Sequence, residues 1–154
     1  MKARQVELPD GIRALDTLTD PSYTYACEIR AQPGDSRPAE QWARAVFEGA
    51  PRPLRWFIVT GWIVGLGLRL GPRPSASHVL GWKILSSTPT TIALGVDSFV
   101  LSAHLVVHVQ DRRVVHATFV RYERRPARIL WTAAAPIHRR VIPYLLGRAA
   151  ANWL

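Results

Sequence analysis

The sequence is poor in cysteine and has no long hydrophobic run. Its 154 residues include one cysteine, which excludes a disulfide framework and a cysteine-rich zinc module. No apolar stretch reaches the roughly 20 residues that a membrane-spanning helix needs. Hydrophobic residues nevertheless make up 48% of the chain and charged residues 20%, which excludes wholesale disorder. We therefore expect one ordinary domain with a buried core.

Lysine is also scarce, although positive charge is abundant. Of the 20 cationic residues only Lys2 and Lys83 are lysines, and the 11 acidic residues leave a formal net charge of +9. Such a charge is compatible with nucleic-acid binding, since cations that neutralise phosphates release counterions. The arginines are spread along the chain, however, and even the densest stretch, 112–148, has no run of five like charges. We expect a solvated basic surface and no nucleic-acid partner.

The usual motifs of nucleophilic catalysis and nucleotide binding are missing as well. There is no Gly-x-Ser-x-Gly sequence, and Cys27 has no catalytic motif around it. Gly65 and Gly67 do not follow a predicted strand and lack the rest of a dinucleotide or phosphate-loop fingerprint. We therefore assign no catalytic residue, no metal and no cofactor. Residues 1–18 lack the apolar segment of a secretory signal, so the cytoplasm is the expected location.

Five stretches have the composition of β-strands. They are 23–30, Val79–Ser87, Thr91–Asp97, Phe99–Val109 and Val114–Arg124. From Phe99 to Val109 every second residue is apolar, which is typical of a half-buried antiparallel strand. All five fall in a single predicted domain over 21–154, which follows an irregular lead-in over 1–20.

Two helices are predicted between the first strand and the others. Residues 37–49 have helical apolar spacing, with Asp35 or Ser36 as the cap. The second segment, 54–70, contains three glycines and no charge between its flanking arginines. We expect it to be a buried helix that packs closely through its glycine side. The alternative is an interfacial membrane segment.

The C-terminal part of the chain has helical periodicity again. The expected helix runs from Ala127 to Leu154, and Pro136 and Pro143 lie inside it. An interior proline costs about 3 kcal/mol and kinks or restarts a helix. We therefore expect this helix to be bent or broken near Pro136.

Both the order of these elements and the final segment resemble a known superfamily. The order is one strand, two helices, four strands and a long helix, and the segment contains Leu130-Trp131, Pro136-Ile137-His138-Arg139 and Pro143-Tyr144-Leu145-Leu146. Over about 21–154 the chain resembles the helix-grip (SRPBCC) superfamily of START domains, pollen-allergen-like proteins and polyketide cyclases, including small bacterial members. The resemblance implies an α+β helix-grip fold, in which a curved antiparallel sheet wraps around the C-terminal helix and leaves an apolar cavity. Members of this superfamily bind lipids, hormones or polyketides, and some catalyse reactions.

Histidines are the main candidates for polar chemistry. His104 and His108 share one face of a predicted strand, about 13 Å apart, which is too far for one metal ion. A three-residue loop over 111–113 would place His116 opposite His108, and a two-residue loop would turn it to the cavity beside Thr118. Asp-Arg lacks the glycine of a favoured two-residue turn, so we expect the longer loop.

The expected function is binding of a hydrophobic small molecule, lipid or polyketide-like, in the internal cavity. His138 and Tyr144 are the expected polar anchors. The predicted ligand-binding residues, which assume the longer hairpin loop, are Trp82, Phe99, Leu101, Leu105, Val107, Phe119, Leu130, Ala134, Ile137, His138, Val141 and Tyr144. One alternative is a cyclase-type or hydrolase-type enzyme that uses His138 or His116 as a base. Another is an interaction module whose basic surface and 54–70 segment contact an anionic membrane or a protein, and the chain is expected to be a monomer or homodimer.

Overall fold

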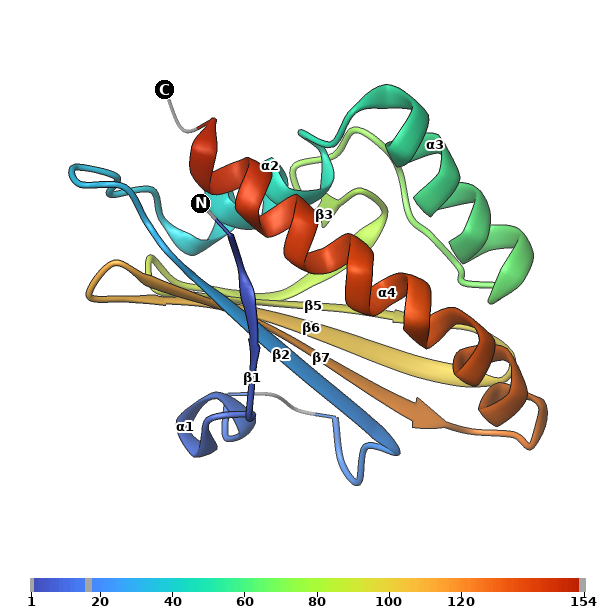
Figure 1. The fold of residues 1–154 in the computed structure, drawn as a ribbon. Coiled ribbons are helices and arrows are strands. Elements are labelled where there is room, and N and C mark those ends of the chain that lie inside the picture. The colour runs from blue at the N-terminus through green and yellow to red at the C-terminus, as the bar shows by residue number, and fades with distance from the viewer. Residues whose placement is uncertain (1, 16–17, 153–154) are drawn as a thin grey trace.

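The computed structural model describes residues 2–15 and 18–152, which form an α+β fold with one seven-stranded antiparallel sheet (Figure 1). The last two residues of the predicted C-terminal helix, 153 and 154, lie outside the described residues. The strands are β1 (Arg4–Val6), β2 (Tyr23–Arg30), β3 (His78–Val79), β4 (Trp82–Ser87), β5 (Thr91–Asp97), β6 (Leu101–Gln110) and β7 (Arg113–Tyr122). The helices are α1 (Asp10–Arg13), α2 (Ala39–Phe47), α3 (Arg52–Thr60), the π-helical turn η1 (Gly61–Gly65) and α4 (Pro126–Ala151).

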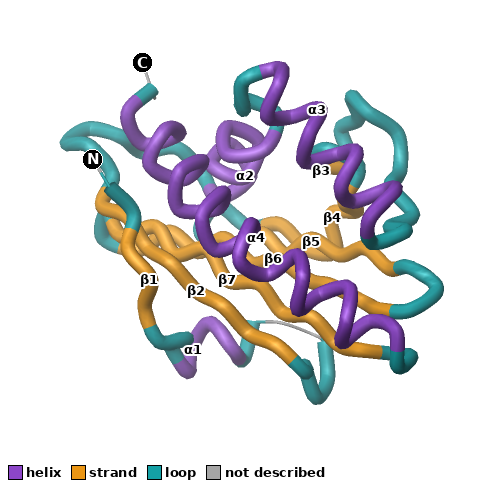
Figure 2. The backbone as a smooth tube through the Cα atoms, turned by 45° about the vertical axis from the view of Figure 1, so that its right-hand side comes forward, coloured by secondary structure: helices purple, strands orange, loops and turns teal. Residues whose placement is uncertain are grey.

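The sheet has helices on both faces, but the larger layer lies on one face only. Its strand order is β1-β2-β7-β6-β5-β4-β3. Helices α2, α3 and α4 lie over one face, which we call the inner face, and the short α1 lies under the opposite, outer face (Figures 1 and 2). This arrangement is the helix-grip layout that the sequence predicted: a curved open antiparallel sheet, two helices after strand β2 and a long C-terminal helix. No helix in the described ranges has the length and apolar character needed to cross a bilayer.

The alternation of β6 sorts its side chains between the two faces of the sheet. Leu101, Leu105 and Val107 belong to the large core between the inner face and the helices. Val106 points the other way, into a smaller core that includes Ile12 of α1. The period-2 pattern of the sequence therefore predicted the inner row of β6 correctly.

The hairpin between β6 and β7 differs from the expectation. Gln110 pairs directly with Arg113, so the loop consists of Asp111 and Arg112 alone. Both loop residues have positive φ, 51° and 67°, as in a type I′ turn. The twist of this turn matches the twist of the two strands, and aspartate tolerates the left-handed region better than most residues. The three-residue loop was therefore wrong, and every β7 side chain lies on the face opposite to the one it implied.

Two other strand predictions need correction at their ends. The stretch Val79–Ser87 is split into β3 and β4 by a turn at Leu80 and Gly81, whose φ values are 46° and 91°. Phe99 lies before β6 because the Ser98 side chain accepts hydrogen bonds from the backbone of Val100 and Leu101 and closes a tight turn. At the N-terminus, where an irregular lead-in was expected, β1 pairs with β2.

Helix α4 is continuous over 26 residues, so the predicted break near Pro136 does not occur. Proline lacks an N–H group and leaves the carbonyl four residues earlier without its helical partner. For Pro136 this carbonyl belongs to Thr132, an exposed residue that water can reach. For Pro143 it belongs to Arg139, and the Tyr25 hydroxyl donates a hydrogen bond to that oxygen over 3.4 Å.

The loop before α2 contains a buried ion pair and is hydrogen-bonded to the end of α4. Asp35 does not cap the helix as expected; its carboxylate accepts two hydrogen bonds from the Arg37 guanidinium, at 3.0 and 2.8 Å. Burial opposes ionisation of Asp35, but these bonds outweigh it and lower the carboxyl pKa below its usual value. Arg37 also donates to the Ala149 carbonyl of α4 at 2.9 Å and lies 4.0 Å above the Trp42 ring.

The segment predicted as a buried helix over 54–70 is shorter and more exposed than expected. Its helical part, Arg52–Gly65, is named here the α3–η1 arm, and none of the residues in the arm is fully buried. A side chain added at Gly61 or Gly65 would meet no atom within 4 Å, so the predicted close packing through glycines is wrong. The arm ends because Gly67 has a φ of 66°, which glycine adopts without strain. Leu66 and Leu68 on either side of it are buried.

Candidate functional site

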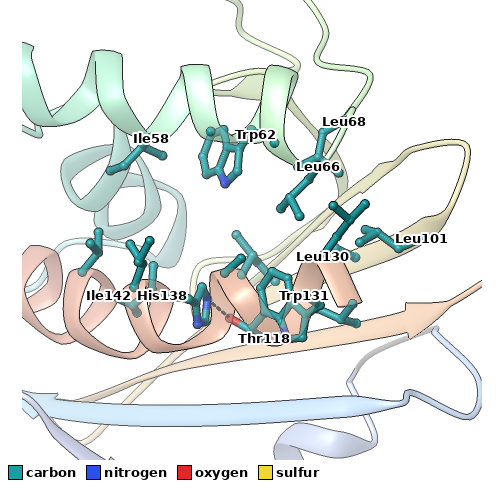
Figure 3. Close-up of a pocket in the computed structure, with 18 of the residues that line it drawn as sticks. Ile58, Trp62, Leu66, Leu68, Leu101, Thr118, Leu130, Trp131, His138 and Ile142 are labelled. Atoms are coloured by element: carbon teal, nitrogen blue, oxygen red, sulfur yellow. Dashed lines mark hydrogen bonds between the residues drawn. The ribbon is translucent and has the colours of Figure 1, made fainter. Parts of the chain in front are cut away.

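A cavity of about 370 Å³ lies between the α3–η1 arm, α4 and the inner face of the sheet. Figure 3 shows its lining side chains converging from these three parts of the fold. The residues that line it are Phe47, Phe57, Ile58, Gly61, Trp62, Gly65, Leu66, Leu68, Trp82, Leu101, Ala103, Leu105, Thr118, Val120, Leu130, Trp131, Ala133, Ala134, Ile137, His138, Val141 and Ile142. Only Thr118, His138 and the three tryptophans among them carry polar side-chain atoms, so the cavity is apolar with few polar positions.

The α3–η1 arm forms the roof of this cavity. Ile58 and Trp62 are one helical turn apart and both point toward α4 and the sheet (Figure 3). The Trp62 ring lies 5.5 Å from the Trp82 ring of β4 and 6.0 Å from the Phe47 ring of α2. These ring contacts connect the roof to α2 and β4 and so hold the arm at a fixed distance from the sheet.

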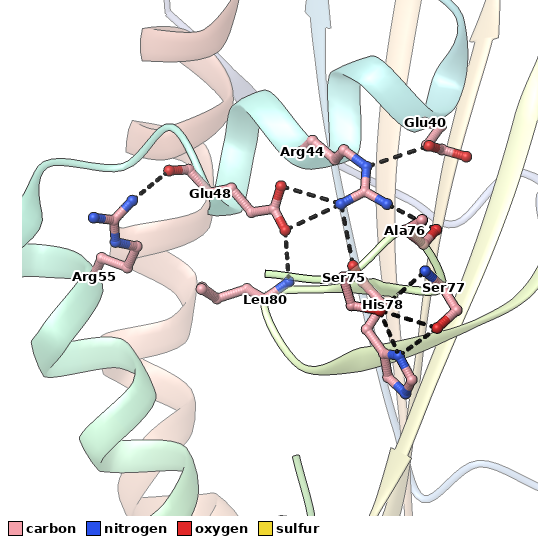
Figure 4. Close-up of polar contacts among 9 residues, drawn as sticks. All are labelled: Glu40, Arg44, Glu48, Arg55, Ser75, Ala76, Ser77, His78 and Leu80. Atoms are coloured by element: carbon pink, nitrogen blue, oxygen red, sulfur yellow. Dashed lines mark hydrogen bonds and ion pairs between the residues drawn. The ribbon is translucent and has the colours of Figure 1, made fainter. Parts of the chain in front are cut away.

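A polar network anchors the base of the roof (Figure 4). The Arg44 guanidinium of α2 binds the Glu48 carboxylate at 3.1 Å and the carbonyl oxygens of Ala76 and His78, each at 3.1 Å. Glu48 in turn accepts a hydrogen bond from the Leu80 N–H, and Arg55 of α3 donates to the Glu48 carbonyl at 2.6 Å. The start of the arm and the loop before β4 are therefore tied to α2.

The floor of the cavity is the inner face of the central strands. Leu101, Ala103 and Leu105 of β6 alternate with outward-facing residues, and β7 supplies Thr118 and Val120 opposite them. Thr118 is the partner of Leu105 in the ladder and is 2% exposed, so its hydroxyl is a polar group in an apolar floor.

The C-terminal helix forms the third wall. Leu130, Ala134, His138, Val141 and Ile142 follow one stripe of α4, with spacings of four, four, three and one residues. Trp131 and His138 are in ring contact at 5.3 Å, and His138 also contacts Tyr25 of β2 at 5.4 Å. The histidine is therefore held from both the helix and the sheet.

Thr118 and His138 form the polar position of the cavity. The Thr118 hydroxyl and His138 Nε2 are 3.3 Å apart, and the dashed line in Figure 3 marks this hydrogen bond. Burial is the main reason that the pKa of His138 falls to about 3, and the neighbouring His116 and Arg139 lower it further. The imidazole is therefore neutral at pH 7, with one donor and one acceptor nitrogen.

His116 lies close to this position but does not line the cavity. It is fully buried on β7, pairs with Val107 in the ladder and lies 5.9 Å from the Phe47 ring. Neither ring nitrogen has a hydrogen-bond partner in the described structure, and burial lowers the pKa of His116 to about 4. His116 and His108 point to opposite faces of the sheet. The predicted register, in which the two histidines would lie opposite one another, is therefore not the observed one.

Eight of the twelve predicted ligand-binding residues line the cavity. They are Trp82, Leu101, Leu105, Leu130, Ala134, Ile137, His138 and Val141. Val107 is buried in the same core but does not reach the cavity. Phe119 belongs to the outer core, because the two-residue loop turns Thr118 inward and Phe119 outward. Phe99 is 66% exposed beneath Arg124, and Tyr144 is 54% exposed on the outer side of α4.

Most residues of the roof were not predicted to line a pocket. Phe57, Ile58 and Trp62 were assigned to a buried helix, and the apolar character of that segment was the signal that could have placed them against a pocket. Thr118 was named only for the hairpin register that was not preferred. Away from the cavity, the Glu28 carboxylate of β2 binds Arg4 and Arg113.

The cavity opens to solvent between the arm and α4. Phe57 and Gly61 on the arm, and Ala133 and Ile137 on α4, both line the cavity and are exposed. An apolar molecule could enter here without crossing the sheet.

Comparison with known proteins found no match for this chain, either among protein-family models or among curated proteins.

Proposed function

We propose that this domain binds a hydrophobic small molecule in the cavity between the α3–η1 arm, α4 and the sheet. The observation that carries the proposal is a 370 Å³ space lined almost wholly by aliphatic and aromatic side chains. Sites for small molecules have volumes of about 300–1,000 Å³ and combine apolar walls with a few polar groups. The cavity meets both conditions, and a lipid-like or polyketide-like compound suits its size and lining. Such ligands also agree with the resemblance to the helix-grip superfamily of START domains and polyketide cyclases.

The Thr118–His138 pair is the anchor for one polar group of this ligand. Because His138 stays neutral at pH 7, the pair offers hydrogen bonds without a charge. An uncharged hydroxyl or carbonyl group is therefore a better partner for it than a carboxylate, because the neutral pair has no positive charge to offset the desolvation of an anion.

A cyclase-type or hydrolase-type enzyme in the same cavity is a weaker proposal. A general base works best when its pKa lies near the working pH. With a pKa of about 3, His138 is a poor proton acceptor at pH 7, and the same burial argument applies to His116. Binding without chemistry therefore fits the polar groups of the cavity better than catalysis does.

The proposal is tested by measuring how a neutral apolar fluorophore, Nile red, binds to a variant whose cavity is filled. Ala134→Phe adds a ring to the cavity wall, and Ala151→Phe adds the same ring to the exposed end of α4 as a matched control. We expect wild type and Ala151→Phe to bind Nile red alike and Ala134→Phe to bind it roughly 10-fold more weakly, because the ring occupies the space where the probe is bound. Equal binding by all three proteins, each folded by circular dichroism, would contradict the proposal.

A further inference from the structure

The α3–η1 arm is apolar on two faces, and the described part of the chain covers only one of them. Its inner side chains Leu54, Ile58 and Trp62 pack against the main core. Its outer face consists of Trp56, Phe57, Ile63 and Val64, and Trp56 and Val64 are 70% and 78% exposed. We call these four residues the outer apolar face.

A cluster of exposed aromatic and aliphatic side chains on one face of a helix is typical of a surface that contacts protein or lipid. In Figure 1 the arm stands away from the sheet, with its outer side toward solvent. The outer apolar face therefore extends over about two turns of helix, and no other element covers it in the described structure.

The charges around this face are positive. The arm carries Arg52 and Arg55 and no acidic residue, and the chain contains no acidic residue from Gly49 to Val96. The first turn of α3 holds Arg52 and no acid, so its charge adds to the positive end of the helix dipole.

The acids that border this stretch are already engaged. Glu48 binds Arg44 and the Leu80 N–H (Figure 4), and Asp97 lies 3.7 Å from Arg69. The net field over the outer apolar face is therefore cationic. It is complementary to a negatively charged surface and repels a second copy of the same face.

We propose that the outer apolar face docks on an anionic lipid bilayer, with the arm lying in the plane of the membrane interface. Trp56 and Val64 insert below the headgroups, where tryptophan is favoured, and the arginines contact lipid phosphates. Phe57 belongs both to this face and to the cavity mouth, so a docked molecule has its cavity open beside the bilayer. The proposal does not depend on what the cavity binds.

Vesicle co-sedimentation tests this proposal directly. Wild-type protein is expected to bind vesicles of phosphatidylcholine mixed with phosphatidylglycerol, to bind pure phosphatidylcholine weakly, and to be released by high salt. The double variant Trp56→Ser/Val64→Ser is expected to bind the anionic vesicles roughly 10-fold more weakly, because both exposed apolar side chains are lost. Arg52→Glu is expected to weaken binding to anionic vesicles only.

The matched control is Leu85→Ser, which removes an exposed apolar side chain from the outer face of the sheet. It should bind anionic vesicles like wild type. No binding of wild-type protein to anionic vesicles, or equal binding by the double variant, overturns the proposal. So does a concentration-dependent dimer that the double variant abolishes, because it would assign the face to a second copy of the chain. None of these outcomes changes the expected binding of Nile red in the cavity, so this proposal and the proposed function can fail separately.

Discussion

His116 is the residue with the most unusual surroundings in this fold. It is fully buried among Cys27, Val107 and Phe47, and neither of its ring nitrogens has a partner in the described structure. A charged imidazole cannot be accommodated there, which is why burial lowers its pKa to about 4. The unfolded chain, in contrast, holds this histidine at its ordinary pKa of about 6.5.

This difference between the His116 pKa of the folded and the unfolded state makes the free energy of unfolding depend on pH in a defined range. Between about pH 6.5 and pH 4 the unfolded state binds a proton at His116 that the folded state does not, so the free energy of unfolding falls as the pH falls. The slope reaches at most about 1.4 kcal/mol per pH unit for each such histidine, and His138 adds to it. We expect His116→Leu to make the slope shallower in this window while leaving stability at pH 7 unchanged or higher, as measured by urea unfolding. An unchanged slope in the variant would contradict this assignment.

At the scale of elements, α4 is the clearest case in which a tertiary contact satisfies a backbone carbonyl that a proline leaves unpaired. A bend or a break was predicted near Pro136, and the helix is not broken at either of its two interior prolines. The carbonyl that Pro143 leaves free accepts a hydrogen bond from Tyr25 of β2. Burial is the main cause that raises the pKa of Tyr25 to about 12, so the hydroxyl keeps its proton and can donate it at neutral pH.

A double-mutant cycle measures this compensation. Tyr25→Phe removes the donor and leaves the Arg139 carbonyl unpaired, so we expect a loss of about 1 kcal/mol in the free energy of unfolding. Pro143→Ala restores an N–H group that can bond this carbonyl within the helix. In the Pro143→Ala background, Tyr25→Phe should therefore cost clearly less. The same cost in both backgrounds would mean that the hydroxyl does not act through this carbonyl.

These elements also show where sequence reasoning succeeds and where it stops. Alternation along β6 predicted that Leu101 and Leu105 face the cavity, since a half-buried strand has only two faces. The position of Phe119 could not be predicted in the same way, because it depends on whether the neighbouring hairpin has two or three loop residues. Asp111 and Arg112 carry no glycine signal, and their left-handed conformation is imposed by the pairing of the two long strands.

For the whole molecule, the resemblance of the element order to the helix-grip superfamily predicted the layout of the fold, but not the form of the site. Two helices after strand β2 and a long final helix leave few ways to cover one face of a seven-stranded sheet. The cavity itself lies where the α3–η1 arm, which ends before Gly67, is tied to α2 at its base and contacts Phe47 and Trp82 through the Trp62 ring. No local pattern in 54–70 predicts how far the arm, which is the roof of the cavity, lies from the sheet, which is its floor.

Native mass spectrometry of the protein, purified under mild conditions from the cells that make it naturally, tests the central claim most directly. The account predicts that wild-type protein and Ala151→Phe retain a neutral, apolar small molecule in equal amount, and that Ala134→Phe has lost most of it. A wild-type protein that carries no such molecule and also fails to bind Nile red would contradict the claim that the cavity is a ligand site.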